Sequence, residues 1–476
     1  WEGLPEWGIL VTKLIGNTLL VGGRRSGGNP GLGIWLGLVL SLLGGAASEG
    51  LANIHSAPVV IPGHQVKTVT HYPISMYRLF RSMPDGSAEV IPFQIDEINE
   101  WGDYVLDQGS DVTAKTGNGI FDLQDELVIM GNDVGPKKKP SKWAFRKPDL
   151  VYEIDFSLMD GATQKAVKNG AVYVGIYFSS PPPLSKRRYV VFNNKTAEVI
   201  TSRYRYGFDR KNWLVARRVE MLQKSDDPKA ESVYLPLMNS STFYMKADLK
   251  YFLTLEVNHR SIDSNLEAYK VGPVRSVIRV SFFYKFLRLK FELGMYTEIS
   301  FFSNAIFLPA IMYNPLDGKK SLNRGSGFYY GMAMKDSPKK FQVKSNMPVY
   351  KKSGFFDFLS EGGQSESRYW LTAQGLDRMM YMEITPSKEM RKAGAIPMLY
   401  IENTPGDKIS KRGNEDARPL GKSPVNIGLY FDMTRFSEGE HVMAFRLYFE
   451  NHNSPTRMQE FQTLPSWRIG ANRVRL

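Results

Sequence analysis

The chain has 476 residues, of which 42% are hydrophobic and 23% charged, and its formal net charge is +13 at pH 7. This composition is that of a globular protein with room for two or three domains. The sequence contains no cysteine, which excludes disulfides, thiolate nucleophiles, cysteine-bound zinc, iron–sulfur clusters and a lipid-bearing cysteine. The positive charge favours anionic partners such as acidic polysaccharide, lipid headgroups or nucleic acid.

Residues 1–52 have the order of an upstream segment followed by a secretory signal. Arg24 and Arg25 precede an apolar run at 31–43, and small residues follow around Ala47. The run is shorter than the roughly 20 residues that span a bilayer. We therefore expect cleavage after Ala47, Ser48 or Ala52 and a periplasmic or extracellular location in a bacterium, which argues against nucleic acid as a partner. The alternative is membrane attachment through an uncleaved signal.

From residue 59 onward, short runs rich in β-branched and aromatic residues are separated by Gly, Pro, Asn and Asp, a spacing typical of sandwiches. We expect strands at 67–72, 151–156, 171–178, 189–192, 251–257, 274–284, 287–295, 425–431 and 442–449. One short helix is expected at 387–393, capped by Ser387 and ended by Gly394. We predict an all-β protein with a smaller acidic N-terminal β domain at 53–150 and a large antiparallel β-sandwich or supersandwich at 151–476.

The segment 96–133 contains ten carboxylates and one lysine, so it carries a net charge of −9 within a chain of net +13. So many carboxylates in one short segment repel one another unless a cation lies among them. The segment therefore predicts a bound cation. With Gly119 at position 6 of a calcium loop, the ligands are Asn118, the backbone carbonyl of Ile120, Asp122 and Asp125.

Positions 1 and 3 of that loop fall on Ala114 and Thr116, which supply no carboxylate. Asp96 and Glu126 are therefore added as candidate calcium ligands from outside it. The alternative is a turn centred on Gly119 whose acids cap or solvate the next strand.

Three residues are candidates for catalysis. His259 is the best single candidate base because it ends an expected strand, where a side chain can enter a cleft. Arg275 and Tyr313 are its candidate partners in a lyase or hydrolase. A structural histidine and a tight turn after Tyr313 are the alternative explanations.

A basic loop holds Lys137, Lys138 and Lys139 beside Trp143. This mixture of cations and an aromatic ring suits a polyanion. A solvated surface loop explains the same residues.

The segment Ile91-Pro92-Phe93-Gln94-Ile95-Asp96-Glu97, followed by Asn118-Gly119 and Asp125-Glu126-Leu127-Val128, resembles a recurring signature of exported bacterial proteins of unknown function. Some of those proteins look like relatives of the galactose-mutarotase-like β-supersandwich, a scaffold of sugar epimerases and polysaccharide lyases. The segment Gly272-Pro273-Val274-Arg275 is similar to one seen in that scaffold. The resemblance implies a β-supersandwich and assigns no catalytic residues.

These observations favour an exported, calcium-stabilised β-sandwich protein that engages a glycan or an anionic polysaccharide. A polysaccharide lyase or glycoside hydrolase is one alternative. An envelope or extracellular structural protein without a small ligand, acting through self-association, is another. The sequence does not decide whether the protein is an enzyme.

Overall fold

The computed structural model describes residues 57–143, 145–159, 166–223, 233–250, 253–259, 261–286, 289–314, 316–334, 342–353, 357–360, 368–374, 378–402, 425–450 and 466–474. The expected signal at 1–52 lies outside the described residues. Within them, no helix is long and apolar enough to cross a membrane.

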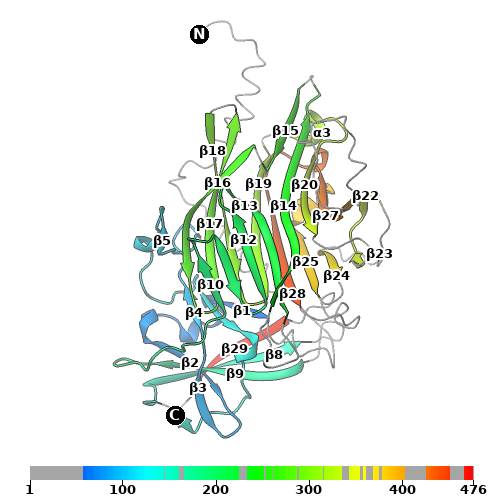
Figure 1. The fold of residues 1–476 in the computed structure, drawn as a ribbon. Coiled ribbons are helices and arrows are strands. Elements are labelled where there is room, and N and C mark those ends of the chain that lie inside the picture. Colours follow the sequence, from blue (N-terminus) through cyan, green and yellow to red (C-terminus); the bar gives the residue numbers. More distant parts are fainter. Residues whose placement is uncertain are drawn as a thin grey trace.

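Most of the chain forms one large set of hydrogen-bonded strands, in which two long runs can be followed (Figure 1). The first run is antiparallel except for its last pair. Its order is β10 (Val190–Asn193), β11 (Glu198–Thr201), β12 (Tyr204–Asp209), β13 (Asn212–Gln223), β14 (Val233–Asp248), β20 (Gly327–Met334), β27 (Val425–Asp432), β26 (Met398–Glu402) and β22 (Val349–Ser353), and β15 (Thr254–Asn258) also pairs with β14.

The second run is likewise antiparallel except at its last pair. Its order is β5 (Gln108–Gly109), β16 (Ile262–Val271), β17 (Ser276–Phe286), β18 (Leu289–Phe301), β19 (Ala305–Asn314), β28 (Gly439–Glu450), β25 (Met379–Pro386), β24 (Tyr369–Gln374), β21 (Gln342–Ser345) and β23 (Asp357–Ser360). A parallel bridge from Asn212 to Ser264 links the two runs.

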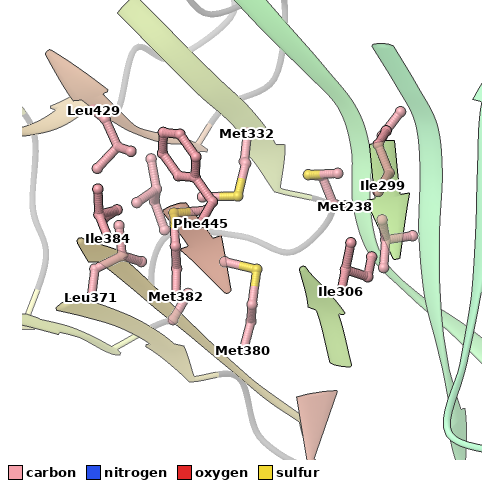
Figure 2. Packing of buried hydrophobic residues seen from close by; sticks show 14 of the residues in the cluster. Met238, Ile299, Ile306, Met332, Leu371, Met380, Met382, Ile384, Leu429 and Phe445 are labelled. Carbon is pink, nitrogen blue, oxygen red and sulfur yellow. The ribbon is translucent and has the colours of Figure 1, made fainter. Parts of the chain in front are cut away.

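The main core joins the two runs of strands. Met238 and Met332 from the first run and Met380 and Met382 from the second are buried in one cluster, together with aliphatic and aromatic side chains of both (Figure 2). Flexible thioethers fill irregular space between twisted sheets. The predicted all-β sandwich is therefore confirmed.

Two smaller sheets form the N-terminal unit, at the bottom of Figure 1. One has the order β1 (Pro58–Pro62), β6 (Glu126–Met130) and β4 (Gln94–Asp96). The other has the order β29 (Ser466–Val474), β8 (Leu150–Met159), β9 (Ala166–Ile176), β2 (Tyr77–Ser82), β3 (Ser87–Val90) and β7 (Lys142–Trp143). The predicted boundary at residue 150 thus runs through one sheet, because β9 pairs with β2 from before it, and β8 and β29 continue the same sheet.

Short-range sequence patterns predicted some individual elements correctly and others wrongly. The expected helix is α4 (Lys388–Ala393), in which Ser387 accepts a hydrogen bond from Met390 N and Gly394 has a φ of 74°. This confirms both caps. The strand expected at 67–72 is wrong, because a 3₁₀ turn, η3 (Lys67–Val69), occupies its start. Besides α4, the described residues contain one other α-helix, α3 (Gly318–Ser321).

A buried ion network attaches the N-terminal unit to the large sheets. Arg275, in the turn between β16 and β17, is 2% exposed and lies 2.7 Å from Asp96 Oδ2 of β4 and 2.6 Å from Glu126 Oε2 of β6. Lys270 Nζ is 2.8 Å from the other Asp96 oxygen. Burial alone would raise the pKa of Asp96, but Lys270 and Arg275 lower it to about 2. All these charges are therefore paired.

Gln94 completes the network. Its side chain donates to both Asp96 oxygens at 2.8 and 2.9 Å and accepts from the backbone N–H of Arg275 at 3.1 Å. A β-carbon at Gly272 would lie 1.7 Å from Gln94 Oε1. Only glycine leaves room at this position for the glutamine.

We predict that Arg275→Met destabilises the protein by about 3–5 kcal/mol, because it leaves Glu126 buried without its cation and removes one of the two from Asp96. The matched control is Arg218→Met, which removes a half-exposed guanidinium paired with Glu198 and should cost at most about 1 kcal/mol. Urea unfolding measures both. Equal losses for the two variants would contradict a special role for Arg275.

Candidate functional site

The N-terminal unit contains a cavity of about 450 Å³ between the segment after β4 and the loop before β6. Twelve residues line it: Glu97, Ile98, Asn99, Glu100, Trp101, Lys115, Thr116, Gly117, Asn118, Asp122, Gln124 and Asp125. Most of the lining is polar or charged, and a single indole stands among these groups.

A tight turn holds Trp101 out toward solvent. The side-chain oxygen of Asn99 accepts hydrogen bonds from the backbone N–H groups of Trp101 and Asp103, and Gly102 has a φ of 87°. This is an Asx-type turn followed by a left-handed glycine. The indole is 60% exposed.

The opposite wall is the loop around Gly119, whose φ is 74°. Glu97 Oε1 accepts from the backbone N–H groups of Asn118 and Gly119 at 2.8 and 2.6 Å. Asn118 in turn donates from Nδ2 to Asp122 Oδ2 at 2.6 Å. These contacts fix the loop against the segment that carries Trp101.

Asp125 is the most buried of the cavity carboxylates, at 2% exposure. Its two oxygens accept from the backbone N–H groups of Ile98 and Asp122 at 2.8 and 2.7 Å. Burial raises the pKa of Asp125 to about 6, although the two backbone bonds oppose the shift. Both oxygens therefore serve the fold of the loop.

Glu100 and Lys115 are the two charged cavity residues whose side chains form no such hydrogen bonds. Both are exposed. Among the described residues, no side chain or backbone group forms a hydrogen bond or an ion pair with either. These two side chains are free to meet a ligand.

The six predicted calcium ligands fall into two groups. Asn118, Asp122 and Asp125 line the cavity, and Ile120 lies between Asn118 and Asp122 in the same loop. Asp96 and Glu126 instead bind Arg275 in the buried network. Within the part of the chain that the structure describes, no group of three or more His, Asp or Glu side chains is arranged to hold a metal ion.

The predicted catalytic residues do not meet at one site. His259 precedes β16 and Arg275 follows it, so this ten-residue strand separates them by about 30 Å. Tyr313 lies near the far end of β19, about 25 Å along that strand from Ala305 at its Arg275 end. Arg275 is buried in its ion network, so it cannot share a substrate with the other two residues.

The basic loop is partly neutralised by neighbours. Lys137 Nζ lies 2.9 Å from Asp155, and Lys138 donates to the carbonyl of Pro84. The ring of Trp143 packs edge-on against Phe80, with 5.0 Å between centroids. The loop therefore offers less free charge and ring surface than its sequence indicates.

Trp101, Glu100 and Asn99 line the cavity but were not among the site residues predicted from the sequence. The available signal was an aromatic residue inside the turn-forming run Asn99-Glu100-Trp101-Gly102-Asp103. A large apolar side chain in such a run has no strand face to occupy and is left at the surface.

Comparison with known proteins identifies no family. No family model matches the chain, and no curated protein matches it. Among solved structures, an α-mannosidase from Enterococcus faecalis V583 is similar with a TM-score of 0.39 and 8% identity, over 88% of this chain and 44% of that one. A glycosyl hydrolase family 38 protein from Enterococcus faecalis has a TM-score of 0.35 and 8% identity, over 91% and 46%.

A family GH92 α-mannosidase from Bacteroides thetaiotaomicron has a TM-score of 0.23 and 11% identity, over 54% of this chain and 28% of its own. The chain thus spans less than half the length of each of these proteins. Likeness at this level identifies neither an activity nor a substrate for this chain.

The pKa of Asp125 predicts a pH-dependent stability. Because its folded pKa of about 6 lies above the unfolded value of about 3.9, the stability this group contributes is fully present below pH 4 and is lost as pH rises toward 6. The free energy of unfolding of the wild type, measured relative to Asp125→Asn, should fall over that interval and then stay constant. A difference that rises with pH would contradict the assignment.

Proposed function

We propose that this protein binds a carbohydrate in the cavity beside Trp101. The observation that carries the proposal is the exposed indole set among carboxylate, amide, hydroxyl and ammonium groups in a space of about 450 Å³. A pocket of this size suits a small ligand.

The chemistry of the lining matches that of a sugar ring. The apolar face of a pyranose can lie on an aromatic ring, while its hydroxyls need acceptors and donors around its edge. Glu100 and Asn118 supply acceptors, Gln124 supplies both kinds of group, and Lys115 supplies a donor. Trp101 combines a large apolar face with a polar edge.

Binding is favoured over catalysis by the state of the carboxylates. Asp125 has the raised pKa that suits a general acid, yet both its oxygens are held by backbone N–H groups. One carboxylate oxygen of Glu97 likewise accepts hydrogen bonds from two backbone N–H groups. A neutral glycan also fits this cavity better than an anionic polysaccharide, because four carboxylates face it against one lysine.

We expect Trp101→Ala to weaken binding of a neutral oligosaccharide by about tenfold or more, since losing a stacked aromatic contact of about 1.4 kcal/mol changes the dissociation constant tenfold. A glycan array followed by calorimetry measures it. Phe178→Ala is the matched control, because Phe178 is a 56% exposed aromatic of the same unit outside the cavity. An array blank for the wild type would refute carbohydrate binding.

We also propose that calcium stabilises the loop around Gly119. The support is the dense acid of the segment and the presence of Asn118, Asp122 and Asp125 on one cavity. Calcium at 100 times its dissociation constant should add about 2.7 kcal/mol to the free energy of unfolding, by mass action. Asp122→Ala should abolish the accompanying rise in melting temperature. A melting curve that is unchanged from zero to millimolar calcium would exclude this site.

A further inference from the structure

The cavity has a charge opposite to that of the whole protein. Glu97, Glu100, Asp122 and Asp125 face it against Lys115 alone, whereas the chain carries +13. Backbone N–H groups bind Glu97 and Asp125, and the side-chain amide of Asn118 binds Asp122, so these contacts bring no positive charge to the carboxylates. The cavity is therefore a local negative field on a basic protein.

Trp101 and Glu100 are neighbours at the rim of the cavity. An indole face attracts a cation through its ring quadrupole, and a free carboxylate attracts it through charge. Glu100 has no partner among the described residues, so its charge is available to a ligand. An aromatic ring beside a free carboxylate is suited to an ammonium group.

We propose that the cavity selects amino sugars that carry a free, protonated amine. This inference rests on the proposed carbohydrate site and names its ligand class. Trp101 binds the sugar face, and Glu100 binds the ammonium group at its edge. The ammonium group of Lys115 repels that of the amino sugar and so limits how strongly the cavity prefers amino sugars to neutral ones.

A matched pair of probes tests the proposal. Oligomers of glucosamine and of N-acetylglucosamine with the same length differ mainly in whether the amine is free. At low salt and pH 6, the glucosamine oligomer should bind about tenfold more tightly, because a cation–π contact and a surface ion pair are added. The preference for the glucosamine oligomer should become smaller at higher salt, because salt screens the attraction between its ammonium group and Glu100.

Two variants locate the effect. Glu100→Gln should abolish the preference, so that the two oligomers bind this variant with equal affinity, because the amide keeps an acceptor oxygen but carries no charge. Glu89→Gln is the control, because it removes an equal charge from a partly exposed side chain of the same unit, paired with Arg81, and should leave the preference intact. The overall charge of +13 repels a cationic probe, so non-specific attraction cannot mimic the result.

The outcomes separate the two proposals. If both oligomers bind equally, or if Glu100→Gln keeps the preference, the amino-sugar inference is overturned and the carbohydrate site stands. If neither oligomer binds and no other glycan does, both fall. If trilysine binds as tightly as the glucosamine oligomer, charge alone governs the cavity and the amino-sugar inference fails.

Discussion

A guanidinium buried at 2% exposure must have its charge matched within the protein, since an unpaired buried ion costs several kcal/mol. Arg275 meets this requirement with Asp96 and Glu126 from two strands of the N-terminal unit. The ring of Tyr104 lies 4.7 Å from the same guanidinium, and its hydroxyl donates to Glu126 at 2.8 Å. Arg275 thus ties the unit to the large sheets, together with Lys270 and the pairing of β5 with β16.

The network also gives a physical role to segments that stood out in the sequence. Gln94 and Asp96 belong to the motif after Ile91, Glu126 to the motif before Leu127, and Gly272 and Arg275 to the turn before β17. They are distant in sequence, yet all contribute to a single set of contacts. Packing and charge matching at a junction account for these residue types without a reaction.

The same strands position the cavity. Glu97 follows Asp96 directly, and Asp125 precedes Glu126. Because successive side chains on extended backbone point to opposite sides, one member of each pair reaches Arg275 while the other faces the cavity. The walls that carry Trp101 and Gly119 therefore begin at strands that the ion network holds in place. A binding site anchored in this way needs little ordering when a ligand enters.

The sequence alone determined much of the local structure of the protein. Short runs rich in β-branched and aromatic residues predicted β27 and β28, and the pair Ser387 and Gly394 predicted α4, because such signals depend on residues within a few positions of one another. It also indicated the acidic segment and a turn at Gly119.

Only the tertiary structure decided how these elements combine. It placed β29 beside β8 across some 300 residues and divided the acids between the ion network and the cavity. It also left the indole of Trp101 60% exposed at the cavity. Such outcomes depend on which distant strands pair and which charges become buried together, and a local pattern carries no information on either.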